Sequence, residues 1–188
     1  MHKEQLISFL DAIMPVSKSL TDYINSSVTP EIFKKGILLA SEGKTANQAW
    51  FITSGLAKEY YYDESGKQVI INFWQEGELM LIAESFFSNE RIKTYLELIE
   101  DSTVLTIQKE EVILLKEKCP ELHRIGYILL IMAKKKGDLR GKLNSLAGKD
   151  RYRQFIKISP WARIPVNDMA SYLGMAPETL SSIRSKIR

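Results

Sequence analysis

The spacing of small, apolar and turn-forming residues over 165–183 is the strongest constraint on this chain, because it fits two short helices that cross at a sharp angle. Ala170 is small where such helices would touch, and Gly174, four positions later, supplies the positive φ of a turn. Pro177 suits the first turn of the second helix, where its missing N–H costs nothing. Apolar residues that would lock both helices to a core are Met169, Leu173, Met175, Leu180 and Ile183. We therefore expect a helix-turn-helix, with an ordinary helical hairpin as the alternative.

Charge divides unevenly along the chain. Residues 134–188 hold thirteen Lys or Arg and four Asp or Glu, a net charge of +9, whereas the remainder holds 13 basic and 19 acidic residues, a net charge of −6. A basic module joined to an acidic one is typical of a sensor attached to a phosphate-binding domain. The alternative is that the basic helices are simply solvated. Together with the helix-turn-helix, the charge predicts double-stranded DNA as a partner.

Composition excludes several classes of site. One cysteine, Cys119, excludes an internal disulfide and any multi-cysteine zinc or iron–sulfur site within one chain, and two histidines, His2 and His123, exclude a His-rich metal site. We expect no metal and no certain cofactor. No signal peptide and no membrane-spanning run is present, so we expect a cytoplasmic protein without a membrane partner. No Ser/His/Asp arrangement or Walker loop occurs, and a cupin-type enzyme would need histidines inside its barrel. We therefore expect no enzyme.

From about residue 29 to 107, short apolar runs are separated by turn residues, which is typical of an all-β barrel or jelly roll. The turns fall at Lys35-Gly36, Glu42-Gly43, Ser54-Gly55, Ser65-Gly66 and Glu76-Gly77. Residues 3–27 read as helical with an interruption at Pro15, and residues 83–89 as a short inserted helix. Residues 95–107 are expected to form a last hairpin that turns at Glu100-Asp101.

A heptad pattern follows the β region. Its apolar positions recur at intervals of three and four residues, with Lys136 as the one interruption: Leu122, Ile125, Leu129, Met132, Leu139, Leu143 and Leu146. Such a seam usually pairs with its own copy, so we expect a homodimer through Leu122, Ile125, Leu129, Met132, Leu139 and Leu143. The alternative is a helix that packs on its own barrel. Gly137, Gly141 and Gly148 weaken the second half and permit a hinge.

Several short strings agree with one known family in order and spacing. They are Phe33-Lys34-Lys35-Gly36, Trp50-Phe51-Ile52-Thr53-Ser54-Gly55, Gly77-Glu78-Leu79, Asp101-Ser102-Thr103-Val104-Leu105, Asp150-Arg151-Tyr152, Ala170-Ser171-Tyr172-Leu173-Gly174 and Pro177-Glu178-Thr179-Leu180-Ser181. In these strings the chain resembles the Crp/Fnr family of bacterial transcription regulators. The resemblance implies an α+β fold. Its parts would be an N-terminal double-stranded β-helix, or jelly roll, of the cyclic-nucleotide-binding type with N-terminal helices (1–109), a long dimerisation helix (110–147) and a C-terminal helix-turn-helix domain (148–188).

The resemblance also implies an effector pocket at Gly77, Glu78, Leu79, Arg91 and Thr94. In the members that bind cyclic AMP, the glutamate takes the ribose hydroxyl, and an arginine next to a serine or threonine holds the cyclic phosphate. Here the arginine and the threonine are not adjacent, and the residues that follow them are bulky. An arginine binds phosphate in a bidentate way only if it is correctly aimed. We therefore expect an effector other than cyclic AMP, or none.

At the DNA end, the resemblance points to Pro177, Glu178, Thr179, Ser181, Ser182, Arg184, Ser185 and Lys186. Glu178 can accept a hydrogen bond from a cytosine amino group. The arginine that the family carries three or four residues later is replaced by Ser181 and Ser182, which predicts weaker or less specific reading of bases. The chain stops at Arg188, so we expect the family's β-hairpin wing to be missing.

The function expected from these features is a homodimeric transcription regulator that reads a near-palindromic operator, with RNA polymerase as a further partner. The alternative is a degenerate ligand-binding or dimerisation module that does not read DNA.

Overall fold

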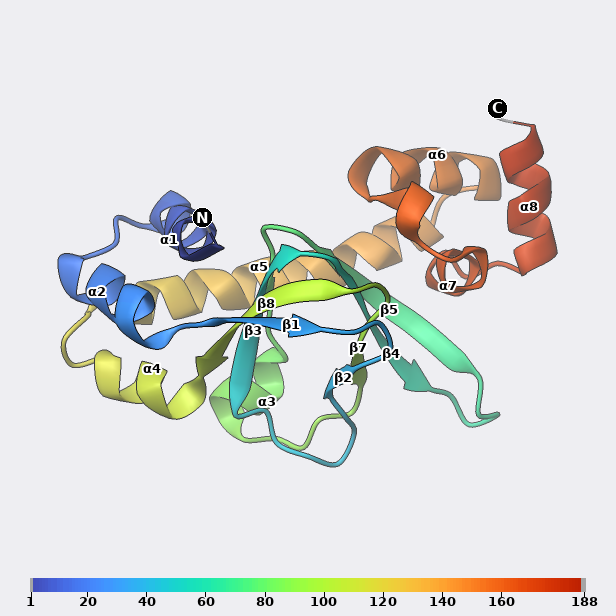
Figure 1. The fold of residues 1–188 in the computed structure, drawn as a ribbon. Coiled ribbons are helices and arrows are strands. Elements are labelled where there is room, and N and C mark those ends of the chain that lie inside the picture. The colour runs from blue at the N-terminus through green and yellow to red at the C-terminus, as the bar shows by residue number, and fades with distance from the viewer. Residues whose placement is uncertain (1, 187–188) are drawn as a thin grey trace.

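The computed structural model describes residues 2–186. Two N-terminal helices, α1 (His2–Ile13) and α2 (Lys18–Ser27), lie at one end of the molecule (Figure 1). The chain is non-helical around Pro15, and Ser17 then caps α2 by accepting a hydrogen bond from the backbone N–H of Leu20 at 3.3 Å. The predicted pair of helices with a break at the proline is therefore confirmed.

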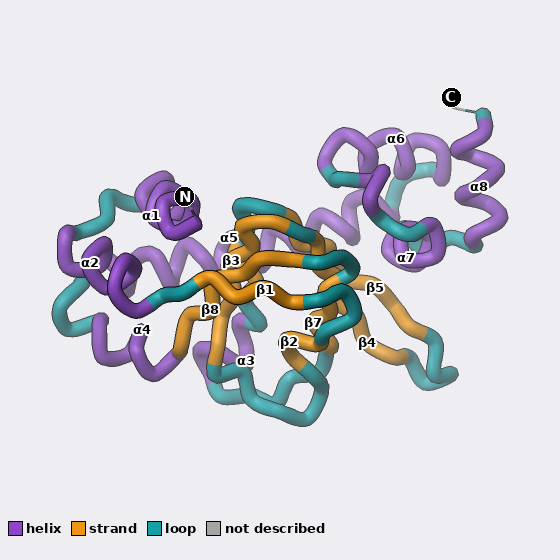
Figure 2. The backbone as a smooth tube through the Cα atoms, in the orientation of Figure 1, coloured by secondary structure: helices purple, strands orange, loops and turns teal. Residues whose placement is uncertain are grey.

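Eight strands form two antiparallel sheets in a β-sandwich. They are β1 (Pro30–Phe33), β2 (Leu38–Ala40), β3 (Gln48–Ser54), β4 (Leu56–Tyr62), β5 (Gln68–Gln75), β6 (Leu79–Met80), β7 (Tyr95–Leu98) and β8 (Ser102–Gln108). One sheet has the order β1-β8-β3-β6 and the other has the order β2-β7-β4-β5. Figure 2 shows the strands gathered in the middle of the molecule, with helices at both ends. In the second sheet β5 is an edge strand, which leaves one side of its backbone open to a partner.

The predicted glycine turns separate these strands. Gly36, Gly43, Gly55, Gly66 and Gly77 all have positive φ. Gly55 is the most constrained of them, because its φ is +118° and an added Cβ would lie 2.0 Å from Oγ of Ser102. The short inserted helix is also present as α3 (Ala83–Ser88). The spacing of the predicted turns in the sequence thus located the strands correctly.

The predicted last hairpin is wrong in its pairing. β7 and β8 do follow one another through a turn at 99–101, but β7 pairs with β2 and β4, whereas β8 pairs with β1 and β3. The turn carries the chain from one sheet to the other, so that Leu98 and Val104 bury their side chains in the same core. Alternating apolar residues identify a strand but not its neighbour.

The segment 110–147 is two helices rather than one. α4 (Lys109–Leu115) ends five residues before Pro120, and α5 (Glu121–Asn144) begins directly after Pro120. Proline suits the start of a helix, and it disfavours helical backbone in the residue before it, here Cys119. The long helix is therefore α5 alone, and it runs along the sandwich from the N-terminal helices toward the C-terminal ones (Figure 1).

Four short helices follow α5 in the described residues. They are α6 (Gly148–Ile158), the 3₁₀ turn η1 (Trp161–Arg163), α7 (Val166–Tyr172) and α8 (Pro177–Ser185). Gly148 begins α6 and so does not lie in the long helix that it was expected to weaken. Gly174, with φ +59°, lies in the turn between α7 and α8, as the sequence predicts. Within residues 2–186, no helix has both the length and the apolar character needed to cross a bilayer.

The C-terminal helices share one hydrophobic core with the sandwich. Buried residues of the helices are Leu143, Tyr152, Phe155, Ile164, Met169, Ala170, Tyr172, Leu173 and Leu180, and those of the sandwich are Leu56, Tyr60, Ile70, Phe73 and Ile99. At the junction, the ring of Phe73 lies 5.3 Å from that of Tyr172 and 6.3 Å from that of Phe155 between centroids. Because this core is continuous, the two parts pack as one body.

Candidate functional site

A carboxylate, an amide and a hydroxyl meet inside the sandwich. β4 and β5 pair so that Glu59 lies opposite Asn72. One carboxylate oxygen of Glu59 accepts from Nδ2 of Asn72 at 2.9 Å, and the other accepts from Oγ1 of Thr94 at 3.1 Å. Burial raises the pKa of Glu59 above its usual range, although both hydrogen bonds and Lys136 act in the opposite direction. This group places a carboxyl beside Thr94, one of the residues that the family resemblance assigns to the effector pocket.

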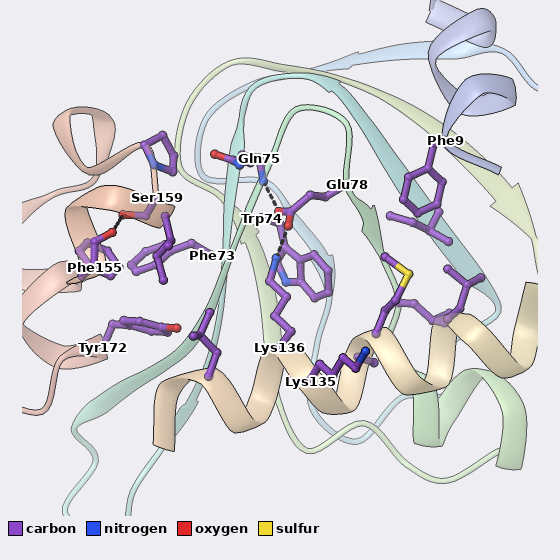
Figure 3. Close-up of a pocket in the computed structure, with 18 residues that line it drawn as sticks. Phe9, Phe73, Trp74, Gln75, Glu78, Lys135, Lys136, Phe155, Ser159 and Tyr172 are labelled. Atoms are coloured by element: carbon purple, nitrogen blue, oxygen red, sulfur yellow. Dashed lines mark hydrogen bonds and ion pairs between the residues drawn. The ribbon is translucent and has the colours of Figure 1, made fainter. Parts of the chain in front are cut away.

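Lys136 of α5 reaches the same region from the other side. Its Nζ lies 2.7 Å from Oε1 of Glu78 and 3.9 Å from the centroid of the Trp74 ring. Figure 3 shows this side chain rising from α5 toward Trp74 and Glu78. Burial lowers the pKa of Lys136, and the attraction of Glu78 and Glu59 partly offsets that effect. The lysine that interrupts the heptad pattern therefore contacts its own sandwich.

Glu78 is held in place by the backbone around it. Its second oxygen, Oε2, accepts from the N–H of Gln75 at 2.8 Å. The tight turn before it depends on Gly77, whose φ is +81° and whose N–H donates to the carbonyl of Ile52 at 2.9 Å. With one oxygen fixed by the backbone and the other on Lys136, the carboxylate has a defined orientation.

A groove of about 410 Å³ opens beside this contact, between β5, α5 and α6 (Figure 3). Its walls are largely apolar and aromatic, and its lining includes Phe9, Phe73, Trp74, Leu129, Met132, Leu139, Phe155 and Tyr172. Glu78 and Lys136 provide charged groups at its wall. An apolar pocket with a few convergent polar groups has the general form of a small-molecule site.

The predicted effector residues are only partly brought together. Gly77, Glu78 and Leu79 form the turn and short strand beside Lys136, as described above. Arg91 is exposed and donates from Nη1 to the carbonyl of Gly43 at 2.9 Å. Thr94 instead binds Glu59. The arginine and the threonine therefore do not converge on one anion.

Sequence reasoning missed Glu59, Asn72 and Trp74 as members of this site, and it assigned Lys136 to the dimer seam. Trp74 is buried and packs in the core of the sandwich. The sequence held one indication of a buried charge: Lys58 and Glu59 are charged residues in the middle of a strand whose other residues are apolar or aromatic. Alternation along that strand sends the two side chains to opposite faces, so one of them had to lie inside the sandwich.

Lys58 faces outward and joins the sandwich to the C-terminal helices. Its side chain is only 10% exposed, and its Nζ lies 3.3 Å from Asp168 of α7 and 3.8 Å from Glu97 of β7. On the free edge of β5, Oγ of Ser171 accepts from the N–H of Ile70 at 3.0 Å and donates to the carbonyl of Gln68 at 3.1 Å. α7 thus satisfies backbone groups that an edge strand leaves unpaired.

Arg163 adds a second polar connection between the two parts. Its guanidinium makes a bidentate contact with Glu76, at 2.9 and 2.7 Å, and also binds Glu100. The hydrogen bonds from Arg163 lower the pKa of Glu76 to about 2, with a further contribution from the N–H of Gly55. Together with Lys58 and Ser171, this contact fixes α6–α8 against the sandwich.

The predicted DNA-contacting residues lie on α8, apart from Lys186, which directly follows it. Leu180 is buried and anchors the helix, whereas the side chains of Pro177, Glu178, Thr179, Ser181, Ser182, Ser185 and Lys186 are exposed. Arg184 is half-buried, and its guanidinium lies 5.7 Å from the centroid of the Trp161 ring. α8 therefore presents one open polar face.

The residues predicted to form the dimer seam divide into two groups, one that packs against the protomer itself and one that is exposed. Ile125 and Leu143 are buried within the protomer, and Leu122 and Leu129 pack partly against its core. For these four residues the alternative, a helix that packs on its own sandwich, describes the contacts. Met132 and Leu139, one heptad apart, remain exposed on α5. Tyr127 is 65% exposed on the same helix.

Comparison with known proteins identifies the fold. Residues 30–118 match the family model of the cyclic nucleotide-binding domain. FixK2 from Bradyrhizobium japonicum aligns with a TM-score of 0.75 at 16% identity, over 85% of this chain and 84% of its own. A Crp/Fnr-family transcriptional regulator from Eubacterium rectale gives 0.74 at 11% identity, over 96% and 87%. The c-di-GMP-responsive global regulator CLP from Xanthomonas campestris gives 0.68 at 14% identity, over 88% and 89%.

No curated protein sequence matches the chain. The structural similarities, at these low identities, concern the fold. Residues 30–118 thus resemble the cyclic nucleotide-binding domain, and the chain shares its overall fold with these solved structures.

Proposed function

We propose that this chain is a DNA-binding transcription regulator of the Crp/Fnr type that acts as a homodimer in the cytoplasm. The observation that carries the proposal is the open polar face of α8, which follows α7 through the turn at Gly174. The net charge of +9 over residues 134–188 supports it, because a basic module attracts a phosphate backbone. The likeness of the fold to Crp/Fnr-type structures supports it further. RNA polymerase is the further partner that such a regulator would meet.

In this proposal α8 is the recognition helix and lies in the major groove. Glu178, in its first turn, accepts from a cytosine amino group. Thr179 and Ser181 bind phosphates through their hydroxyls, and Arg184, steadied against Trp161, contacts the backbone as well. A twofold dimer would then read a near-palindromic operator, with half-sites about one helical turn apart.

Fluorescence anisotropy of a labelled duplex from the gene's own upstream region tests the proposal. We expect tighter binding to this duplex than to a scrambled one, with a steep loss of affinity as salt rises. Glu178→Gln should lower the ratio between the two duplexes, at about 1–3 kcal/mol per base contact. Glu64→Gln, in the distant β4–β5 hairpin, is the matched control. Equal weak binding to both duplexes would refute operator reading.

Met132 and Leu139 supply the dimer contact in this proposal, because they are the heptad positions exposed along α5, whereas Leu146, also exposed, lies after the helix ends. Light scattering should show a dimer for the natural chain and a monomer for Met132→Glu with Leu139→Glu. Lys142→Glu, an exposed position on the same helix, should leave the dimer intact. A double variant that stays dimeric would exclude this face as the interface.

The effector, in this proposal, is not cyclic AMP. Arg91 binds a backbone carbonyl at the surface, Thr94 is engaged by Glu59, and Lys136 already pairs with Glu78. Arg91, the one arginine within residues 30–118, is thus not available to a cyclic phosphate, and the region contains the carboxyl of Glu59. Cyclic AMP should leave both the melting temperature and DNA affinity unchanged.

A second candidate is a ligand-binding or dimerisation module that does not read DNA. Ser181 and Ser182 favour it, because arginine bound to guanine is the commonest specific base contact and serine cannot replace it. A stable dimer that binds both duplexes equally and weakly would support this candidate over the first.

A further inference from the structure

We propose that Trp74 and Glu78 form a recognition site for a primary ammonium group, that Lys136 of the same chain is its built-in occupant, and that a linear primary amine can take its place. The site concerns the sandwich and α5, so it does not depend on DNA reading by α8.

The geometry around Nζ of Lys136 is that of a bound cation. The indole of tryptophan is the best aromatic face for an ammonium, and here the nitrogen lies 3.9 Å from the ring centroid. A carboxylate oxygen of Glu78 lies 2.7 Å away, within hydrogen-bond distance. Gln75 fixes the other oxygen of that carboxylate, so the site is oriented from the strand side and does not rely on Lys136 for its shape.

The surroundings also favour a cation. The carboxylate of Glu59 attracts Lys136 from inside the sandwich. Two buried polar atoms close to these residues in the strand, Nε1 of Trp74 and Oδ1 of Asn72, have no hydrogen-bond partner among residues 2–186. Buried polar atoms without partners are uncommon, and Oδ1 is an acceptor that a further N–H could satisfy. Two carboxylates and a free amide oxygen make this region suited to an amine and unsuited to a phosphate.

The position of Lys136 on α5 supports its role as an occupant. Its heptad neighbours, Leu129 and Leu143, pack into apolar surroundings, and an apolar residue at 136 would do so without desolvating a charge. The lysine side chain instead crosses the groove and places its ammonium between the ring of Trp74 and the carboxylate of Glu78. Its alkyl stem lies along the apolar groove, as an alkylamine would.

An internal ligand is hard to displace, because its attachment gives it a high effective concentration at the site. The natural chain should therefore resist small amines, whereas a chain that lacks the lysine side chain should bind them. An amine that enters would free the middle of α5 from Trp74 and Glu78 while leaving the apolar contacts at Ile125 and Leu143. Binding of an amine at this site would thereby weaken the contact between the sandwich and α5.

Chemical rescue tests the inference on the full-length protein. In Lys136→Ala, n-propylammonium replaces the missing Cγ, Cδ, Cε and Nζ. We expect its melting temperature to rise with n-propylammonium concentration and calorimetry to give a saturable isotherm. The natural chain should respond at least tenfold more weakly at the same concentration. n-Propanol, which has the same length without the charge, and sodium chloride at equal ionic strength should give no rise.

A double variant separates this site from general amine effects. Lys136→Ala combined with Glu78→Gln keeps an oxygen for the N–H of Gln75 but removes the charge, and it should lose the response to n-propylammonium. A folded Lys136→Ala that does not respond, or a double variant that responds equally, would overturn the inference. DNA affinity plays no part in these readouts, so a failure of the proposed function would leave them unaffected.

A measurement on the natural chain covers the case in which Lys136→Ala does not fold. In protein labelled with ¹³C-lysine, the ring of Trp74 should shift the ε-methylene protons of Lys136 upfield, and Glu78→Gln should reduce that shift. An ε-methylene signal at the position of solvated lysines in the natural chain would overturn the inference.

Discussion

Ser171→Ala removes a hydroxyl that bridges α7 to the outer edge of β5. In the natural chain, that hydroxyl accepts from the N–H of Ile70 at 3.0 Å and donates to the carbonyl of Gln68 at 3.1 Å. In the part of the chain that the structure describes, no strand pairs with this side of β5, so the edge depends on α7 for these two backbone groups. Alanine fits the helix but offers neither an acceptor nor a donor.

The expected cost follows from the two lost bonds. A net contribution of about 0.5–1.5 kcal/mol is typical for each neutral hydrogen bond, and an unpaired buried N–H costs about 1–3 kcal/mol. Ser171 is half-buried, so water can recover part of that loss, and alanine has the better helix propensity. We expect the free energy of unfolding to fall by about 1–2 kcal/mol, which is a factor of about 5–30 in the equilibrium.

Hydrogen exchange at the amide of Ile70 and guanidinium denaturation measure this loss together. The amide should exchange faster by about the same factor, and the denaturation midpoint should fall without a change in slope. Ser182→Ala, at an exposed position on α8, is the matched control and should change neither quantity. If the Ile70 amide exchanges at the natural rate in Ser171→Ala, the bridge does not protect the edge of β5 and the reasoning fails.

Three further perturbations have defined outcomes. Because Arg163 holds the pKa of Glu76 near 2 against an ordinary value of 4.5, the stabilising effect of that carboxylate is complete above about pH 4.5 and lost as the pH falls toward 2; Glu76→Gln should flatten acid denaturation in that window. Gly55→Ala meets both a positive φ and a close approach, so it should destabilise by clearly more than Gly66→Ala, which has a positive φ but open space and should cost about 1–2 kcal/mol by thermal denaturation. Phe155→Ala should cost about 3–5 kcal/mol, and calorimetry should still show one transition, because the deleted ring lies in the shared core; two separate transitions in the natural chain would contradict that core.

Local features of the fold were predictable from the sequence. Glycine at a positive φ marks a turn whatever surrounds it, so Gly36 and Gly174 were identified correctly. Strand pairing was not predictable in the same way. The turn after β7 carries the chain from one sheet to the other, and its residues do not indicate which strand β8 pairs with. The break before α5 was visible in Pro120, since the heptad pattern begins only at Leu122, but the segment boundary at residue 110 placed both helices in one unit.

The site was predictable only in part. Glu78 was named through the family resemblance as part of an effector pocket, and that role stays a prediction; in the structure its carboxylate contacts Lys136 and the backbone N–H of Gln75. Lys136 was read as an interruption in a dimer seam, because periodicity shows which side of a helix a residue occupies but not which surface lies opposite. The role of Glu59 depends on its register against Asn72, which is a long-range property of the sheet.

The continuous core described above has a consequence for the modularity of this chain. A protein engineer who transplants residues 148–188 onto another sandwich would expose the apolar faces of Phe155 and Tyr172 unless the recipient offers equivalents of Ile70 and Phe73. A functional chimera must therefore carry the outer surface of β5 along with the C-terminal helices. The part that can be transplanted between proteins is therefore the packed interface between β5 and the C-terminal helices. Its residues come from separate segments of the sequence.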